Sequence, residues 1–599
     1  MRFKIILILL IFYASLLSED SEEKLFSFED ETYHSTELSD LLQSYKKKPI
    51  NINTAAENEL ALIPWLSEKD IQKIISYRVS NKITNLKDLS KIGIDEITVN
   101  ELSDYITFGA SIKLKLKQAS RVEFHQPKQY LPSTLKYFQK TILTLNNYKF
   151  GFISQKDEGE KDPLDFYSYF MDYSSEHYLK KLLIGKYRLA LGQGILFAPK
   201  LGMSKSGAAT SVPIKKFNLI KPYTSSYEIW ELEGAVANID LSAFNIIPFF
   251  SRTSISANLD TLSHITSFNE SGLHLDETKK NNVREIIYGL ATKYSLTDHS
   301  LGLNIAKIYF DHQFSNPARE NEYTAISADF IINKSSFPTF SEIAYSQQRI
   351  AGVIGSKFGE NELRHLLLFR YYEKDFPTWH GNPFSSQSRF DNEVGLYYGM
   401  TIIPFEKTKI NCYFDLWSFP QTRYFEKMPS VGSEQFIQIE RKFDTNSLRI
   451  SVQHKDKEKY ISLDESKIRD FERTTFRADW WQNLDNFRFK TRCDIVTEFL
   501  ANDDIHRSGI LVYEEIKWKI EKLTLIGQIS VYHSDVLHYM YEHNVDGIMQ
   551  NSILKGDGAY SYFVFKYNIF KDIELQFKVS DHWNTKDKMR LYLQVISSF

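Results

Sequence analysis

The last eleven residues of the chain alternate in polarity with a period of two, and this pattern constrains the fold more than any other feature. One set of alternate positions holds Met589, Leu591, Leu593, Val595, Ser597 and Phe599. The other set holds Arg590, Tyr592, Gln594, Ile596 and Ser598. Successive side chains of a β-strand point to opposite faces of a sheet. We therefore expect the chain to end in a strand with one mostly apolar face.

Runs of the same kind recur from Arg121 onward, each about ten residues long, which is the length of a tilted strand that spans a membrane. Tight links are expected near Asn146, Asp240, Asp298, Lys334, Lys407, Asp444, Asp485, Lys522 and Lys571. Longer polar segments are expected at 156–164, 192–225, 254–284, 312–322, 374–391, 419–432, 456–468, 499–507 and 534–557. Short and long connections alternate, as periplasmic turns and outer loops of a membrane barrel do. The pattern predicts about 24 strands.

The aromatic end of the last strand resembles the closing strand of Gram-negative outer-membrane β-barrels. This resemblance implies that Phe599 is the barrel-assembly terminus, and that outer-membrane lipid and the barrel-assembly machinery are partners. Closure of the sheet removes strand edges, which lipid cannot hydrogen-bond. The expected fold is mostly β, a large transmembrane antiparallel barrel over residues 120–599 preceded by a small all-α domain. A soluble periplasmic all-β protein is the alternative.

The N-terminus carries the pattern of an export signal. Arg2 and Lys4 precede an apolar run that ends at Leu17. This run is too short for the roughly 20 residues of a spanning helix, so residues 1–18 are expected to be a secretory signal peptide. Residues 19–48 are predicted to form an acidic linker without a function of its own. The only cysteines, Cys412 and Cys493, supply neither a disulfide framework nor a metal site.

Residues 49–110 are predicted to form a domain of four short helices. Thr54 and Thr98 each stand three residues before a glutamate, which is the pattern of a capping box. Ser67 and Asn85 are candidate N-caps for the two helices between them. Two hairpins of short helices are therefore expected.

The stretch from Asn51 to Ser67 resembles the helix-hairpin-helix module of competence-type DNA receptors, and 91–95 resembles its second hairpin. In that family glycines let a DNA phosphate approach the backbone amides. Here the candidate contacts are Pro64, Trp65, Leu66, Ser67, Gly93, Ile94 and Asp95. Only one glycine remains among them, and residues 49–108 hold six Lys or Arg against nine Asp or Glu. Because phosphate neutralisation drives DNA affinity, the sequence favours docking of a periplasmic protein over DNA binding.

The longest expected loop, Leu191 to Ser226, is glycine-rich and basic. Its candidate functional residues are Gly192, Gln193, Gly194, Lys200, Lys205, Lys215, Lys216 and Lys221. A wide barrel has an open lumen unless something fills it. We expect either that this loop folds into the lumen or that it is a flexible surface loop.

The whole arrangement resembles Gram-negative envelope proteins that combine a helix-hairpin-helix module with a large outer-membrane barrel. The stretch from Gly185 to Gly194, and then Tyr223 to Ala235, carries much of this resemblance. We expect a channel, export or assembly component; a DNA-uptake protein and a structural or adhesive surface protein are the alternatives. The spacing of His533, His538 and His543 does not favour a metal site. No catalytic, cofactor or metal residue is predicted, and the chain is not expected to be an enzyme.

Overall fold

The computed structural model describes residue 45 and residues 49–599, with gaps. The gaps are residues 62, 64–65, 109–113, 126–134, 161, 163, 176, 200–204, 206, 212–218, 227–229, 270–271, 273–275, 297, 334–336, 361, 378, 388, 423–428, 461–467, 501–504 and 584–588. The predicted signal peptide lies outside the described residues, as does all of the predicted linker except Tyr45.

The first described part is a small helical domain. It contains α3 (Glu57–Leu60), α4 (Glu68–Ser80), α5 (Leu86–Lys91) and α6 (Glu96–Leu102), with the short parallel pair β1 (Ile50–Asn51) and β2 (Ile106–Thr107). Ser67 and Asn85 cap α4 and α5 as expected, because each side chain accepts a bond from a backbone amide. The expected starts at Thr54 and Thr98 are wrong: α3 begins after Ala56, and Asp95 caps α6. No helix in the described part of the chain is long and apolar enough to cross a membrane.

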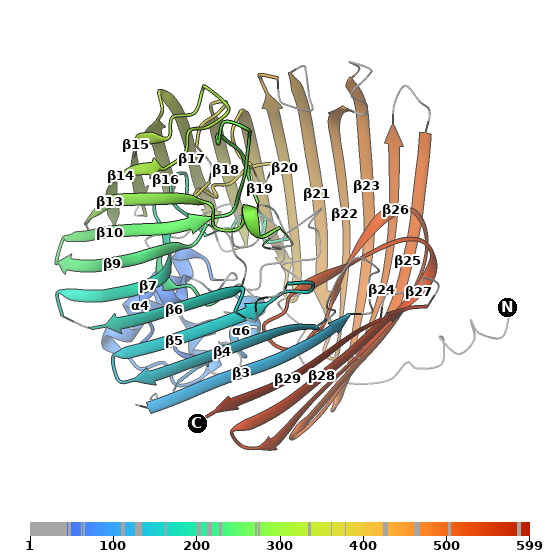
Figure 1. The fold of residues 1–599 in the computed structure, drawn as a ribbon. Coiled ribbons are helices and arrows are strands. Elements are labelled where there is room, and N and C mark those ends of the chain that lie inside the picture. Colours follow the sequence, from blue (N-terminus) through green and yellow to red (C-terminus); the bar gives the residue numbers. More distant parts are fainter. Residues whose placement is uncertain are drawn as a thin grey trace.

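The rest of the chain forms one closed antiparallel barrel with a wall of 24 strands (Figure 1). The wall strands are β3 (Leu114–His125), β4 (Leu135–Leu145), β5 (Tyr148–Lys156), β6 (Phe166–Ser174), β7 (Leu179–Ala190), β9 (Leu232–Leu241), β10 (Phe244–Ile255), β13 (Val283–Ser295), β14 (His299–Phe310), β15 (Glu322–Ile332), β16 (Thr339–Ser346), β17 (Arg349–Glu360), β18 (Leu363–Tyr372), β19 (Glu393–Phe405), β20 (Thr408–Phe419), β21 (Ser430–Lys442), β22 (Asn446–Tyr460), β23 (Ile468–Leu484), β24 (Phe487–Leu500), β25 (Ile505–Ile520), β26 (Leu523–Glu542), β27 (Gln550–Phe570), β28 (Ile573–His582) and β29 (Arg590–Ser598). The predicted fold class is confirmed.

Four shorter elements lie in the connections. They are β8 (Leu219–Pro222), β11 (Ala257–Leu259), β12 (Ile265–Phe268) and the 3₁₀ turn η2 (Glu277–Lys279). β11 and β12 form a small separate sheet, whereas β8 pairs with the wall strand β7.

The first and last wall strands close the barrel. β29 pairs with β3 from Arg590↔His125 to Ser598↔Lys117. Beyond this ladder, the amide of Leu116 donates to the carbonyl of Phe599 at 2.8 Å, and the amide of Phe599 donates back at 2.9 Å. The terminal residue is therefore part of the seam that removes the last strand edges of the sheet.

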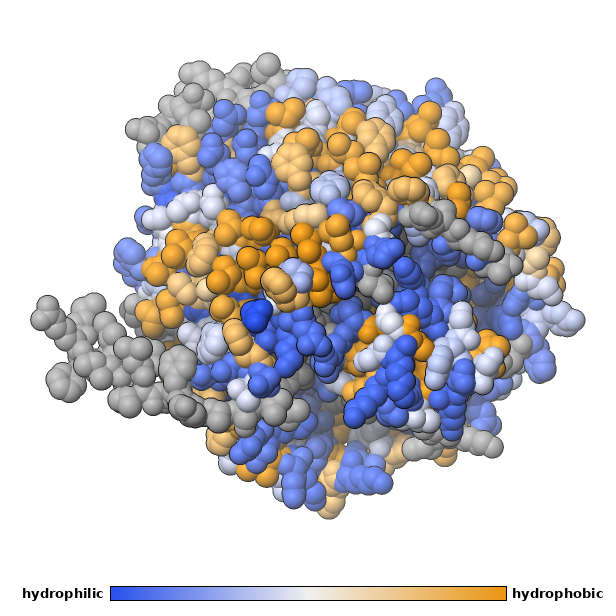
Figure 2. All heavy atoms as spheres, turned by 180° about the vertical axis from the view of Figure 1, so that it is seen from behind, coloured by the Kyte–Doolittle hydropathy of each residue, from blue (hydrophilic) through white to orange (hydrophobic). Residues whose placement is uncertain are grey.

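Apolar side chains cover the outside of the wall, and small or polar ones face the lumen. In β14, Leu301 and Leu303 are more than half exposed, whereas the intervening lumen side carries Asn304 and Ala306, both buried. Figure 2 shows apolar side chains gathered in broad patches over the wall. A closed sheet with an apolar outer surface is the form in which strands cross a lipid bilayer. The chain forms an outer-membrane β-barrel.

Short turns gather at one end of the barrel and long connections at the other. Asn146, Lys407 and Asp485 take the positive φ that two-residue hairpin turns require. One outer connection is also tight, since β16 and β17 are joined directly through Gln347 and Gln348. The expected outer loop at 534–557 is wrong: most of it belongs to β26 and β27, which form the longest hairpin among the described residues.

Candidate functional site

The chain leaves β7 and turns into the barrel at the predicted Gly-Gln-Gly stretch. Gly192 and Gly194 have φ values of 51° and 87°, which favour glycine. The amides of Gln193 and Ile195 donate to one carboxylate oxygen of Glu342, on β16, at 2.7 and 3.0 Å. All these groups are buried. The start of the connection between β7 and β9 is thereby fixed to the inner wall. The described residues of this connection, 191–199, 205, 207–211, 219–226 and 230–231, are here called the lumen segment.

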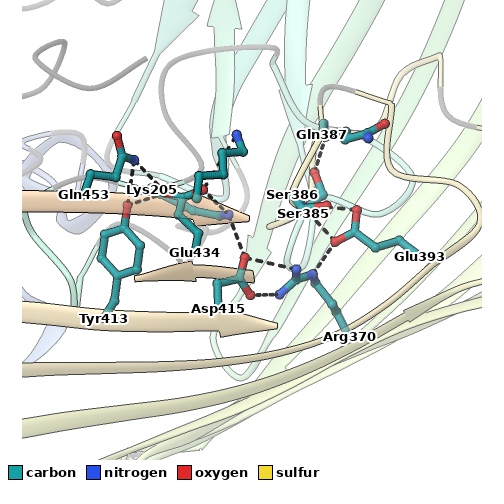
Figure 3. Close-up of polar contacts among 11 residues, drawn as sticks. Lys205, Arg370, Ser385, Ser386, Gln387, Glu393, Tyr413, Asp415, Glu434 and Gln453 are labelled. Carbon is teal, nitrogen blue, oxygen red and sulfur yellow. Dashed lines mark hydrogen bonds and ion pairs between the residues drawn. The ribbon is translucent and has the colours of Figure 1, made fainter. Parts of the chain in front are cut away.

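Lys205 fixes the lumen segment to a second part of the wall (Figure 3). Its ammonium nitrogen lies 2.7 Å from Asp415 of β20 and 2.9 Å from Glu434 of β21. All three side chains are at least nine-tenths buried. Burial alone would lower the pKa of Lys205, but the two carboxylates hold this pKa above its ordinary value. The side chain is therefore a buried cation held between two acids.

The acids around Lys205 belong to a larger polar network. Arg370 of β18 donates to both carboxylate oxygens of Asp415, at 2.7 and 3.2 Å, and also contacts Glu393. The hydroxyl of Tyr413 donates to Glu434 at 2.5 Å. Figure 3 shows these side chains converging from neighbouring strands on the lumen. The network is assembled by the wall, and Lys205 joins the lumen segment to it.

A third attachment lies just beyond Lys205. The hydroxyl of Tyr397, on β19, donates to the carbonyl of Ala209 at 2.7 Å. The hydroxyls of Thr210 and Thr401 lie 3.2 Å apart, and both residues are buried. The lumen segment thus contacts the inner face of β16, β19, β20 and β21.

A second inward-folded connection, residues 373–392, packs on the first. The amide of Ala198 donates to the carbonyl of His380, and the amide of Asn382 donates to the carbonyl of Gly194, both at 2.8 Å. The ring of His380 lies 2.9 Å from Glu285 of β13. Three aromatic side chains of this connection, Phe376, Phe384 and Phe390, are buried. The two connections therefore form one packed body inside the barrel.

The tip of the β26–β27 hairpin occupies the opposite part of the lumen. Its ladder shifts register between Ser534 and His538. At the tip, the amide of Asp546 donates to Gln576 at 2.7 Å, and its carbonyl accepts from Gln594 at 2.8 Å. Lys566 lies 2.6 Å from the carboxylate of Asp546. The tip thus reaches inward-facing side chains of β27, β28 and β29, and sequence reasoning missed this.

The inner wall between these bodies carries paired charges. Arg477 donates to both oxygens of Asp494 at 2.6 Å, and Arg492 donates to Asp479 at 2.5 Å. These four side chains lie on β23 and β24 and are buried. A polar, ion-paired lumen is typical of a wide membrane barrel and not of a soluble β-sandwich core.

The other predicted residues of the basic loop are placed as follows. Lys200, Lys215 and Lys216 lie outside the described residues. Lys221 lies on β8, opposite Arg188 of β7. The structure therefore places the Gly192–Gly194 stretch beside Glu342, and Lys205 at a separate site between Asp415 and Glu434.

The predicted hairpin residues occupy several positions. Pro64 and Trp65 lie outside the described residues, and Leu66 and Ile94 are buried in the core of the helical domain. Ser67 is an N-cap, and Gly93, at a φ of 85°, accepts a bond from Lys73. Among the described residues of this set, Gly93 is the exposed one.

Asp95 joins the helical domain to the short-turn end of the barrel. It accepts two bonds from Thr98, at 3.0 and 2.8 Å, and its carboxylate lies 3.9 Å from Arg364 of β18. Burial acts to raise the pKa of Asp95, but Lys409, Thr98 and Arg364 together hold this pKa below its ordinary value. Close by, the side-chain amide of Asn333 donates to the carboxylate of Glu68 of α4 at 3.2 Å.

The histidines noted in the sequence do not converge. His533 is exposed beside Asp557, whereas His538 and His543 are buried within the barrel. Among the residues placed by the structure, no group of three or more His, Cys, Asp or Glu side chains could hold a metal ion.

Comparison with known proteins adds a likeness of overall form. No protein-family model and no curated protein sequence matches the chain. A mutant of the ferric enterobactin receptor PfeA from Pseudomonas aeruginosa is 9% identical, with 82% of this chain and 81% of that chain covered and a TM-score of 0.41. The siderophore receptor PirA from Acinetobacter baumannii is 7% identical, with 82% of each chain covered and a TM-score of 0.40. The copper transporter OprC is 8% identical, with coverage of 82% and 81% and a TM-score of 0.42. Likenesses at this level do not identify a function for the chain.

Proposed function

We propose that this barrel is a transport channel of the outer membrane, closed at rest by its own inward-folded segments. The observation that carries the proposal is the attachment of Lys205 to Asp415 and Glu434. A surface loop that leaves the mouth of the barrel open would not require a buried cation between two carboxylates of the wall. Buried ion pairs add little net stability compared with apolar packing, but they fix one specific geometry.

A closure of this kind can be reversed. The attachments described above to Glu342, Asp415, Glu434 and Tyr397 are polar contacts to the wall, and polar contacts can be exchanged for water when the segment moves. Apolar packing, such as that of Phe197 on Phe249 of β10, adds to them. The inner face of the wall itself carries paired charges such as Arg477 with Asp494, so a water-filled path remains compatible with the wall.

Conductance in planar lipid bilayers tests this proposal. Purified full-length protein is compared with a variant in which residues 199–211 are replaced by a glycine-serine linker of the same length. We expect the wild type to be mostly closed and the variant to conduct. The control is Lys307→Ala, which changes an exposed residue on the outer wall and should leave the protein closed. A wild type that conducts as well as the 199–211 variant would contradict the proposal.

We further propose that the helical domain is a helix-hairpin-helix module that docks a periplasmic protein and not DNA. Four short helices in two hairpins support this proposal, as does the net negative charge of residues 49–108. Asp95 caps α6 and faces Arg364 of the barrel, so the second hairpin is already occupied by the chain's own barrel. The free end of α4 offers Val79, which is 81% exposed, to a partner.

Site-specific photo-crosslinking in cells tests the docking proposal. A photoreactive residue at position 79 should give adducts with a periplasmic protein, and the same residue at position 95 should give none. Adducts at position 79 that disappear on nuclease treatment would instead support the DNA-uptake alternative.

A further inference from the structure

The helical domain and the barrel wall meet through groups of opposite charge. The acids of the domain are Glu57 of α3, Glu68 and Asp70 of α4, and Asp95, which caps α6. The bases of the wall, here called the basic patch, are Lys293 of β13, Lys357 of β17, Arg364 of β18 and Lys409 of β20. Each base lies within three residues of the strand end at the short turns. The basic patch is therefore at the periplasmic end of the barrel.

The four bases face the lumen. In β18, Leu363 and Leu367 are 42% and 45% exposed on the outer surface, whereas Leu366 is buried. Because side chains alternate along a strand, Arg364 shares the lumen side with Leu366. The same alternation puts Lys293 on the side of the buried Ala291, Lys357 on that of Val353 and Lys409 on that of Tyr413. The basic patch therefore lies on the inner surface of the barrel mouth.

The wall neutralises the basic patch only in part. Deeper in the lumen, Arg370 donates to both oxygens of Asp415 on β20. At the mouth, by contrast, Lys357 is close enough to Arg364 for the two charges to repel each other. The Nε of Arg364 is buried and has no hydrogen-bond partner among the described residues. In the described part of the wall, these two bases therefore have no paired acid.

Two acids on the lumen side of the wall lie near the other two bases. Asp329 of β15 attracts Lys293. Glu440 of β21 is opposite Lys409 in the ladder, but it also lies 3.9 Å from Arg449 of β22. Two acids against four bases leave the basic patch with a net positive charge.

The acids of the helical domain supply the remaining counter-charge. Asp95 lies 3.9 Å from Arg364 and also attracts Lys409. The side-chain amide of Asn333 donates to Glu68 at 3.2 Å, which holds α4 against the wall. The other attractive pairs are Glu68 and Asp70 with Lys357, and Glu57 with Lys293. Four acids at three helices thus match four bases on four strands.

We infer that the basic patch is a binding site for an anionic solute with phosphate or carboxylate groups, and that the helical domain occupies this site at rest. This inference rests on the proposed channel, whose cargo passes the patch at the periplasmic mouth. Ammonium and guanidinium groups bind phosphate and carboxylate through charge-assisted hydrogen bonds. The pair of Arg364 with Asp95 is long, and both side chains are partly exposed, so a solute anion can replace Asp95.

Anion binding to the full-length protein in detergent tests this site. The probe is inorganic tripolyphosphate, and calorimetry measures its Kd at physiological ionic strength, where charges more than about 8 Å apart are largely screened. Glu68→Gln/Asp95→Asn removes two competing charges, and asparagine can still cap α6. This double variant should bind tripolyphosphate about tenfold more tightly than the wild type, which corresponds to about 1.4 kcal/mol.

The matched control is Glu59→Gln/Asp104→Asn, which removes the same charge from the same domain. Glu59 accepts a bond from the amide of Ala56 within the domain, and Asp104 is exposed. The described charges that act with Glu59, on Tyr45 and Arg78, also belong to the domain and not to the wall. The Kd of this variant should equal that of the wild type.

A second control removes the basic patch itself. Lys357→Gln/Arg364→Gln, added to Glu68→Gln/Asp95→Asn, should abolish the gain in affinity. If this fourfold variant fails to form a heat-modifiable barrel, Lys409→Gln replaces the two wall substitutions and should reduce the gain.

Three results would overturn the anion site. They are an equal Kd in Glu68→Gln/Asp95→Asn and the wild type, an equal gain in Glu59→Gln/Asp104→Asn, and a gain that persists after the wall substitutions. If the 199–211 variant conducts ions in these cases, the channel stands and only the anion site is wrong. If tripolyphosphate binds as expected but the 199–211 variant stays closed, the basic patch still binds anions and the channel is wrong.

Discussion

Replacement of Lys205 by alanine should open the channel. The substitution leaves Asp415 and Glu434 buried without the cation that lies between them. Removal of one partner from a buried ion pair costs about 3–5 kcal/mol. We expect the lower end here, because Asp415 keeps two bonds from Arg370 and Glu434 keeps its bond from Tyr413. The closed state is the state that loses this energy.

A loss of about 3 kcal/mol changes the ratio of closed to open molecules by roughly 100-fold. The assay is the open probability of single channels of full-length protein in planar bilayers. The matched control is Lys307→Ala, which removes a cation from an exposed pair with Glu322 on the outer wall. Such surface pairs contribute about 0–1 kcal/mol, so this control should stay closed. Lys205→Ala channels that stay as closed as the wild type would refute the reasoning.

Three further results are expected. Gly192→Ala should weaken the closed state by about 1–3 kcal/mol, because the φ of 51° is unfavourable for alanine and the new Cβ would lie 2.7 Å from the carboxyl carbon of Glu342. The open probability of single channels measures this effect, and an unchanged open probability would refute it. Hydrogen bonds from Thr84 and Lys91 lower the pKa of Asp88 from 3.8 to about 2. The contribution of Asp88 to the stability of α5 is therefore present above pH 3.8 and is lost as the pH falls through about 2. Hydrogen exchange of the α5 amides should become faster over this pH range, and an identical pH profile in Asp88→Asn would contradict the prediction. Deletion of Phe599 should reduce the yield of heat-modifiable barrel, because it removes both backbone hydrogen bonds with Leu116. The control Phe599→Trp should retain the yield. Equal yields from the deletion and the wild type would refute the prediction.

The barrel was predictable because its signals are local. Each strand shows its two faces through side-chain parity, and each short turn shows itself through residues such as Asn146 that tolerate positive φ. Lumen-facing acids also leave a trace: Asp415 is fully buried between Phe414 and Leu416, which face lipid. A lone acid within an apolar strand therefore marks the lumen side.

The interior was not predictable, because its contacts join residues far apart in the chain. Lys205 meets Asp415 and Glu434 more than two hundred residues later, and no spacing rule relates them. The inward bend of the β26–β27 hairpin depends on a register shift after Ser534. Where β26 and β27 are buried on both sides, polar and apolar residues alternate only in part. The sequence of this stretch therefore looked like that of a loop.

The helical domain shows a similar limit. Asp95 stood out in the sequence as a charge that would repel DNA phosphate. In the structure the same carboxylate caps α6 and faces Arg364 of the barrel. Capping was detectable at Ser67 and Asn85 because each precedes a clear helix. The contact with the barrel depends on Arg364, which lies more than 250 residues away and is invisible to local reasoning.

Disulfide trapping between Thr210 and Thr401 tests the central claim most directly. Their hydroxyls lie 3.2 Å apart, so cysteines at both positions can approach the disulfide bond length of about 2 Å with a small shift. In a background without Cys412 and Cys493, we predict that the pair crosslinks in native membranes and keeps even Lys205→Ala closed until a reductant is added. Failure of the pair to crosslink, or full conduction through the crosslinked protein, would contradict a lumen closed by the chain's own loop.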